Sequence, residues 1–146
     1  MTAKLRLAAP EDAAKLDRLM AACHDETGRA MDEDARSAAL EPLLAGDVPG
    51  AAYLIGPPSS PVGYVLLRFG YSVAQGGMVA DIDEIYIRPP VRNRAMASEA
   101  VNSLARNLRN LGIARLTARL NDAAPDALFR RLLFKGRSEQ RLDLAL

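Results

Sequence analysis

The stretch DIDEIYIRPPVRNRAMASEAVNSLARNLRNL, residues 81–111, decides the fold of this chain. A strand pattern of alternating apolar and acidic residues ends at Pro89-Pro90, two arginines follow in a short loop, and an amphipathic helix pattern begins directly after it. The first N–H groups of a helix have no intrahelical partner, and the helix dipole favours negative charge beside them. The order of strand, tight loop and helix start therefore predicts a site for a phosphate group.

Hydrophobic periodicity on either side of this stretch predicts one domain spanning residues 1–146, with the element order β-αα-βββ-α-β-α-β. We expect strands over residues 4–8, 51–55, 62–69, 78–87, 115–120 and 140–146. We expect helices that begin at Pro10 and at Ser98, and helices over residues 33–44 and 126–134. This order is typical of an α/β (α+β) fold in which helices flank both faces of a mixed central β-sheet.

Composition narrows the classes of partner and of site. The 19 Lys and Arg nearly cancel the 18 Asp and Glu, for a net charge of +1, so no overall charge attracts nucleic acid or an anionic membrane, and we expect neither partner. The single cysteine, Cys23, rules out an internal disulfide. With no signal pattern at the N-terminus and no apolar run near ~20 residues, a cytoplasmic location is predicted. We see no metal-ligand spacing and expect no metal.

The neighbours Cys23 and His24 invite a thiol–imidazole interpretation. Successive residues of a helix point about 100° apart, so these two side chains cannot pair directly. Cys23 continues the apolar stripe of its predicted helix and is interpreted as packing. His24 is predicted to be an exposed helix residue.

Two motifs and the element order resemble the GCN5-related N-acetyltransferase (GNAT) superfamily. Its central signature is a strand, then Arg/Gln-x-x-Gly-x-Gly/Ala, then a helix, and this sequence has Arg92-Asn93-Arg94-Ala95-Met96-Ala97 in that place. The superfamily often shows an Asn after its fifth strand and then Ala-Leu-Tyr-x-x-x-Gly-Phe. Here Asn121 follows the predicted strand, and residues 127–134 read ALFRRLLF. The resemblance covers nearly the whole chain.

The resemblance implies that acetyl-CoA lies in a gap of the sheet as a co-substrate. Its pantetheine arm would pair with the backbone of Ile85, Tyr86 and Ile87, and Asn121 and Phe129 would also contact it. Its diphosphate would rest on the backbone N–H groups of Arg92, Asn93, Arg94, Ala95, Met96 and Ala97, since convergent amides and a helix dipole hold a diphosphate without particular side chains. The arginine side chains of this loop would add charge-assisted contacts.

The resemblance also implies transfer of an acetyl group to a primary amine by direct attack. An amine is nucleophilic only when neutral, so such an enzyme needs a base. Glu84 is the candidate, with Tyr86 beside it on the same face and Asp81 and Asp83 on the opposite face. The acceptor is expected to be a small-molecule amine or a lysine-bearing substrate. Homodimerisation is a possibility by analogy alone.

Acidic residues in the first third of the chain bear on the acceptor. They would suit a cationic amine if they border the cleft, although solvated helix faces explain them equally well; they are Asp25, Glu26 and Asp32–Asp34.

Three positions depart from the superfamily pattern. Ala95 and Leu133 replace glycines, and Phe129 replaces the tyrosine that protonates the leaving thiolate in many members. Tyr64 and Tyr71 are candidate substitutes for that phenol. The departures favour an alternative, a catalytically weak or inactive acyl-CoA-binding or protein-interaction module, and a fold without any coenzyme is a third possibility.

Each candidate residue also has a structural interpretation. Glu84 can be a surface carboxylate or a salt-bridge partner, and Tyr86 an amphipathic core ring. Asn121 can cap the turn that follows it. Arg92 and Arg94 can be ordinary loop arginines.

Overall fold

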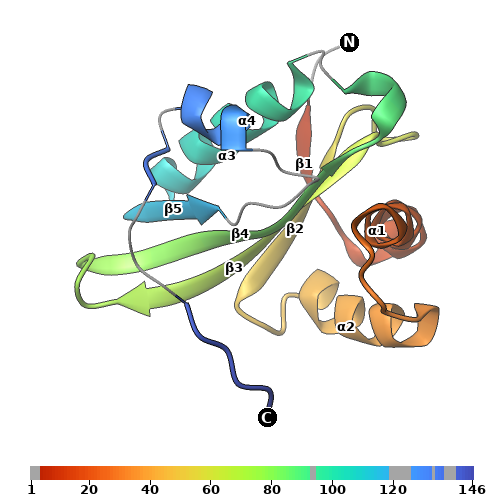
Figure 1. Ribbon diagram of the computed structural model, residues 1–146, viewed down its shortest axis with the longest axis horizontal. Helices are drawn as coiled ribbons and strands as arrows, with labels where there is room; N and C mark the ends of the chain where they lie inside the picture. The colour runs from red at the N-terminus through yellow and green to blue at the C-terminus, as the bar shows by residue number, and fades with distance from the viewer. Residues whose placement is uncertain (1–3, 93–94, 119–125, 133, 137–140) are drawn as a thin grey trace.

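The computed structural model of this chain describes residues 4–92, 95–118, 126–132, 134–136 and 141–146. Its centre is a five-stranded sheet in which the strands follow their order in the sequence (Figure 1). The strands are β1 (Leu5–Leu7), β2 (Gly50–Ile55), β3 (Gly63–Ser72), β4 (Gly77–Ile87) and β5 (Arg115–Ala118). The first four pair antiparallel, and β5 joins β4 in parallel. The sheet is therefore mixed, as predicted.

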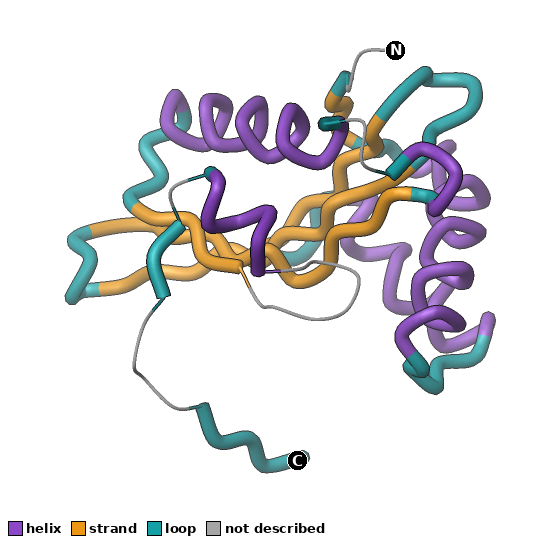
Figure 2. Tube along the Cα trace, turned by 45° about the horizontal axis from the view of Figure 1, so that its top comes forward, coloured by secondary structure: helices purple, strands orange, loops and turns teal. Residues whose placement is uncertain are grey.

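Helices cover both faces of the sheet (Figure 2). On one face lie α1 (Ala13–Thr27), which follows the short turn η1 (Pro10–Asp12), and α2 (Glu33–Ala45). On the other lie α3 (Met96–Asn110), which follows the turn η2 (Pro89–Val91), and α4 (Asp126–Arg131). Each pair of helices buries apolar side chains against the sheet. The predicted arrangement of helices on both faces is confirmed.

The sheet divides the interior into two cores. We call the core beneath α3 and α4 the α3-side core; its strand residues include Val65, Leu67, Ile82, Ile85 and Ile87. We call the core beneath α1 and α2 the α1-side core; its strand residues include Ala52, Leu54, Tyr64, Leu66 and Tyr86. Strand side chains alternate between the faces of a sheet, so both faces are apolar where helices cover them.

Local signals account for the limits of the helices. The α2 helix begins after Asp32, whose Oδ1 accepts a hydrogen bond of 2.7 Å from the backbone N–H of Ala35. Such a side-chain acceptor satisfies one of the donors that a helix start leaves free. The α1 helix ends at Gly28, which has a φ of 71° and so adopts the left-handed conformation that favours glycine.

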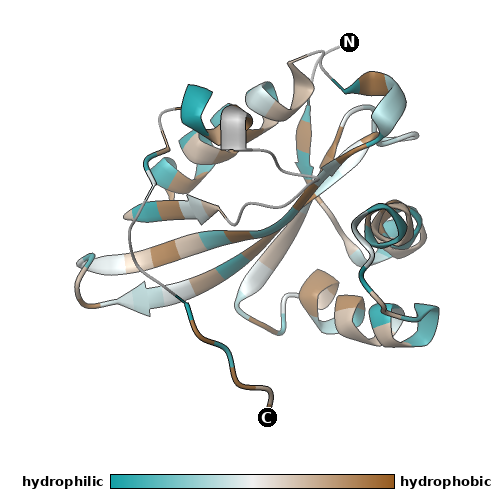
Figure 3. Cartoon of the chain, in the orientation of Figure 1, coloured by the Kyte–Doolittle hydropathy of each residue, from teal (hydrophilic) through white to brown (hydrophobic). Residues whose placement is uncertain are grey.

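The end of the chain differs from the sequence-based expectation. A strand was predicted over residues 140–146, and Gln140 lies outside the described residues. Residues 141–146 leave the sheet without strand pairing, and all six are exposed (Figure 1). Leucines alternate with polar or small residues there, as Figure 3 shows, with Leu142 92% and Leu144 83% exposed. Alternation indicates a chain able to form a strand, but a strand also needs a partner edge.

The last helix is also shorter than expected. The prediction extended it over residues 126–134, whereas α4 ends at Arg131. Phe134 lies beyond the helix, and its backbone N–H donates to the carbonyl of Phe129. Leu132 and Phe134, two of the apolar residues that suggested more helix, lie beyond α4 and pack against the α3-side core.

The α3 helix begins in an unusual backbone conformation. Its N-cap, Ala95, has φ 60° and ψ 8°, and its side chain makes no capping hydrogen bond. It is the one non-glycine residue with a positive φ in the described part of the chain. The Cβ of an L-residue is strained in this left-handed region, where glycine is the usual residue. The loop therefore has a backbone that suits the glycine of the superfamily motif.

We predict that Ala95→Gly stabilises the protein. Removing the Cβ relieves strain at positive φ, and the expected gain is about 1 kcal/mol in the free energy of unfolding, measured by urea denaturation. Ala105→Gly, the same substitution inside α3, is the matched control and is expected to cost about 1 kcal/mol. Destabilisation by both substitutions would contradict this interpretation of the loop.

Candidate active site

One extra residue in β4 determines the position of Glu84. In the β3–β4 register Leu66 lies opposite Glu84 and Leu67 lies opposite Ile82, so Asp83 is a β-bulge. A bulge shifts the alternation of side chains by one residue. Ile82 therefore faces the α3-side core, and Glu84 faces the side of α1 and α2 together with Tyr86. The predicted shared face of Glu84 and Tyr86 is confirmed.

The same bulge corrects the predicted direction of Asp81. Asp81 lies opposite Arg68 on β3, two residues beyond Leu66, which is opposite Glu84. Asp81 therefore shares a face with Glu84, whereas uninterrupted alternation had placed it on the other side. Arg68 Nη2 lies 3.9 Å from Asp81 Oδ2, and Arg68 Nε lies 3.7 Å from Asp83 Oδ1.

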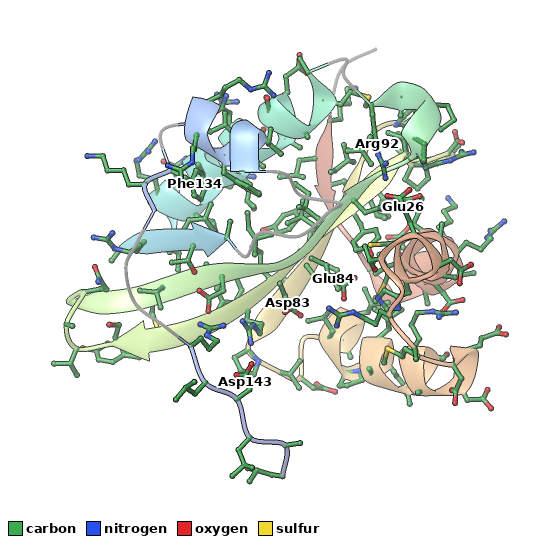
Figure 4. The ribbon with its side chains drawn as sticks, viewed as in Figure 1. Glu26, Asp83, Glu84, Arg92, Phe134 and Asp143 are labelled. Carbon is green, nitrogen blue, oxygen red and sulfur yellow. The ribbon has the colours of Figure 1, made fainter. Side chains whose placement is uncertain are left out.

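The Glu84 carboxylate lies between two buried donors. Its Oε1 accepts a hydrogen bond of 2.8 Å from the Tyr64 hydroxyl and lies 3.1 Å from His24 Nε2. Tyr64 is fully buried, the His24 side chain is 3% exposed, and the Glu84 side chain is 10% exposed. Hydrogen bonds to a charged group are worth about 1.5–3 kcal/mol each, which offsets part of the cost of burying a carboxylate. Figure 4 shows Glu84 between β4 and α1.

Tyr64 acts as a hydrogen-bond donor in this arrangement. Burial, together with the charge of Glu84, raises the pKa of the Tyr64 phenol well above its usual range, so the hydroxyl keeps its proton. The Tyr64 ring also packs against Tyr86, with 5.9 Å between ring centroids. The sequence had left the position of Tyr64 open, and the structure brings it to the candidate base.

His24 is the functional residue that sequence reasoning placed wrongly. It was expected to be exposed, but it lies in the interior between α1 and β4. The signal was present in the helical spacing, because Leu16, Met20 and His24 follow one another at intervals of four residues on the buried side of α1. Nε2 of the imidazole faces Oε1 of Glu84. The other nitrogen, Nδ1, is buried and has no hydrogen-bond partner.

Cys23 is buried in the α1-side core, as predicted for a packing residue. Burial raises the pKa of its thiol, so Cys23 is not a ready nucleophile. His24 of α1 therefore pairs with Glu84 of β4 and not with its neighbour Cys23.

In the described part of the chain, the edge of β4 that faces away from β3 is paired over only part of its length. Among the described residues, β5 pairs with β4 only as far as Ile82, while β3 stays paired as far as Ile87. Antiparallel neighbours turn their backbone groups toward and away from each other in alternation, and Arg88 N–H donates to the carbonyl of Val62 near β3. The N–H and C=O groups of Ile85 and Ile87 therefore point away from β3. Both side chains lie in the α3-side core.

Arg92 contacts this edge. Its Nε donates to the carbonyl oxygen of Ile87 at 2.8 Å, and its Nη2 lies 2.7 Å from Oε2 of Glu26 on α1. The guanidinium carbon lies 5.4 Å from the centre of the Tyr86 ring, in a cation–π contact. Figure 4 shows Arg92 and Glu26 facing each other near the end of β4. The side chain of Arg92 thus joins α1 to β4, and its charge is paired.

The remaining predicted coenzyme residues lie around the start of α3 or outside the described residues. Ala95 is exposed, Ala97 is half-buried, and Met96 is buried beneath the helix. Asn93, Arg94 and Asn121 lie outside the described residues, as does Leu133.

Phe129 belongs to the α3-side core. It is 2% exposed and makes an edge-to-face contact with Phe134, with ring centroids 5.2 Å apart. By sequence, Phe129 is either a core residue or a residue that lines the coenzyme gap, and this contact supports the core interpretation.

Neither a metal-binding cluster nor a membrane-spanning helix is present among the described residues. They contain no group of three His, Cys, Asp or Glu side chains that could hold a metal ion. None of their helices combines the length and the apolar character needed to cross a membrane.

Comparison with solved structures shows the same fold in proteins of similar length. An integron cassette protein from the mobile metagenome of Cole Harbour Salt Marsh is 27% identical, with a TM-score of 0.87, over 97% of this chain and 90% of that one. A ribosomal-protein-alanine N-acetyltransferase from Brucella melitensis biovar Abortus 2308 is 15% identical, with a TM-score of 0.78 and 99% of each chain covered. A predicted acetyltransferase from Clostridium acetobutylicum, determined with acetyl-CoA, is 13% identical, with a TM-score of 0.80, over 97% of this chain and 95% of that one.

A comparison with curated protein sequences gives no match. The sequence profile described as "Acetyltransferase (GNAT) family" matches residues 15–133, which include the strand, the loop, the helix start and the buried carboxylate described above. With a match over most of its length and a fold that agrees, this chain belongs to the acetyltransferase (GNAT) family.

Proposed function

We propose that this protein is an N-acetyltransferase that moves the acetyl group of acetyl-CoA to a primary amine by direct attack. The observation that carries the proposal is the buried Glu84 carboxylate, held by Tyr64 and His24 beside the stretch of β4 that β5 does not pair among the described residues. A carboxylate kept in a fixed orientation and still 10% exposed is suited to accept a proton.

Glu84 acts as the base, directly or through one water molecule. Free alkylammonium groups have a pKa near ~10.4, so the acceptor amine must lose a proton before its lone pair can attack the thioester carbon. Since Oε1 already accepts bonds from two donors, Oε2 is the oxygen left to take that proton. Attack forms the new C–N bond, and collapse of the tetrahedral intermediate breaks the C–S bond and releases the coenzyme A thiolate. The second proton of the attacking nitrogen then passes to that thiolate or to solvent.

The coenzyme arm is assigned to the outer edge of β4. The backbone groups of Ile85 and Ile87 point away from β3, so they can pair with an extended pantetheine chain as they would with another strand. Met96 and Ala97 supply N–H groups in the first turn of α3 for the diphosphate. Arg92 assists by fixing the end of β4 against α1, because its own charge is paired with Glu26.

The thiolate leaves without a phenol at position 129. A thiol has a pKa of about 8.5, so its anion is a fair leaving group near neutral pH. Phe129 therefore slows the reaction and does not prevent it. Tyr64 is no substitute acid in this scheme, since its hydroxyl already donates to Glu84.

Replacing the candidate base provides the direct test. Glu84→Gln keeps an oxygen that can accept from Tyr64 and His24 but removes the basic carboxylate. We expect kcat to fall by about 10²–10⁴-fold, the usual contribution of a general base. The measurement is the release of free thiol from acetyl-CoA with a panel of primary amines. Glu41→Gln, the same change on the exposed side of α2, is the control. A Glu84→Gln variant with the full rate would remove Glu84 as the base.

Binding of the donor is tested separately from chemistry. Acetyl-CoA at about 100 times its Kd is expected to add about 2.7 kcal/mol to the free energy of unfolding, observed as a higher Tm. Glu84→Gln should show the same stabilisation, because Glu84 serves the acceptor. The absence of any shift at millimolar acetyl-CoA would contradict the assignment of the β4 edge and the α3 start.

A second candidate function, a non-catalytic acyl-CoA-binding or protein-interaction module, is favoured by the burial of Phe129 in the α3-side core. Phe129→Tyr separates the two candidates. If the protein is a slowed transferase, we expect kcat to rise by about tenfold, less than a typical general acid gives because thiolates leave readily. Lack of turnover with every amine in both forms would favour the module, and urea denaturation confirms that the variant is folded.

A further inference from the structure

A cavity of about 380 Å³ lies between the N-terminal half of α1, the β2–β3 loop and the end of β4. Its charged lining consists of three cations: Lys15, Arg18 and Arg88. Two loop serines, Ser59 and Ser60, add hydroxyl groups, and the rest of the lining is apolar apart from the amphipathic ring of Tyr86. A larger hollow of about 780 Å³ between η1, α1 and α2 is lined by the carboxylates of Asp17, Glu33 and Glu41 and by Arg18, which borders both hollows. Of the two, only the smaller cavity has a purely cationic charged lining.

The three cations of the smaller cavity stand outside the ion pairs that the described side chains form. No carboxylate lines the cavity, and no ion pair found among the described side chains includes Lys15, Arg18 or Arg88. Lys15 Nζ donates to the carbonyl oxygen of Pro58 at 3.0 Å, a contact that orients the ammonium without cancelling its charge. Like charges gathered around one cavity repel each other unless an anion enters it.

Two of the acidic residues that would suit a cationic acceptor already have partners within the protein. Glu26 forms the ion pair with Arg92, and Asp32 caps α2 through Ala35. None of the acids named in the sequence analysis lines the cavity, and the charged side chains that do line it are positive.

Tyr86 connects this cavity to the candidate base. Its ring forms part of the lining, and it follows Glu84 by two residues on the same face of β4. One repeat of a strand spans about 7 Å, so the cavity lies next along the strand from Glu84. A small acceptor can place its amine beside Glu84 and its other end in the cavity.

We propose that this cavity binds an acidic group, a carboxylate or a phosphate, carried by the acceptor amine. The inference rests on the proposed function, since it assigns the class of acceptor for the same site. Lys15, Arg18 and Arg88 bind the acidic group by charge-assisted hydrogen bonds, and the serines and Tyr86 add neutral donors. The acceptor is then an amine bearing an acidic group and not a polyamine.

The first test uses inorganic phosphate as the probe, without acetyl-CoA, by isothermal titration calorimetry at low salt. Arg18→Gln and Arg88→Gln are each expected to weaken phosphate binding at least about tenfold, since each removes a charged contact. The control is Arg106→Gln, on the exposed side of α3, which should leave the affinity unchanged. Equal losses in all three variants, or no binding by the wild type, would overturn the proposal.

The second test separates the acceptor from the phosphates of the coenzyme. Saturating acetyl-CoA should leave the Kd for phosphate unchanged if the cavity serves the acceptor. Displacement of phosphate by acetyl-CoA would assign the three cations to the coenzyme and overturn the inference.

The third test compares a carboxylate-bearing primary amine with its uncharged carboxamide in the thiol-release assay. Arg88→Gln is expected to raise KM for the acid at least about tenfold and to leave KM for the amide unchanged. Turnover with no preference for the acid would contradict this inference alone. Phosphate binding without turnover of any amine would contradict the proposed function, and with it the assignment of the anion to an acceptor.

Discussion

The antiparallel pairing of β4 with β3 has to accommodate one more residue in β4 than in β3. β3 has 10 residues and β4 has 11, and the difference is absorbed at Asp83. Ile82 and Ile85, three residues apart, can then both enter the α3-side core, while Glu84 turns toward α1. If the side chains alternated regularly through Asp83, Glu84 would share a face with Ile82 and enter the apolar α3-side core. The bulge makes an inward-facing carboxylate compatible with an apolar strand.

A carboxylate turned inward needs donors, and the opposing elements supply them. Tyr64 comes from β3 and His24 from α1, so both neighbours of β4 on this face contribute to one oxygen. The same helix provides Glu26, which pairs with Arg92 at the end of β4. The position of α1 over the sheet therefore determines the orientation of the Glu84 carboxylate as well as the shape of the end of β4. Because the buried polar atoms are linked, removing one donor leaves a charged acceptor short of partners, which is costly in a low-dielectric interior.

Most of the fold was predictable because its elements carry strong local signals. Apolar periodicity, the Gly and Pro turns and the acidic helix starts predicted all five strands of the sheet, and α1, α2 and α3 as well, close to their observed positions. The final strand was wrong for residues 141–146, since alternating leucines indicate a capacity to pair and not the presence of an edge. Around the site, Glu84 and Tyr86 were correctly placed on one face. Asp81 was placed wrongly because the sequence carries no signal for the bulge at Asp83. His24 was placed wrongly because a polar helix residue was assigned to the solvent side.

The sequence by itself determined the identity of the fold, the strand–loop–helix order at residues 81–111 and the choice of Glu84 as the candidate base. These features depend on residue type and short-range spacing, which the chain carries locally. Only the tertiary structure decided that Tyr64 and His24, distant in sequence, meet at Glu84, and that the Ala95 backbone is left-handed. Such contacts arise from the packing of whole elements against one another, and no local pattern encodes which side chains then face each other across the interior.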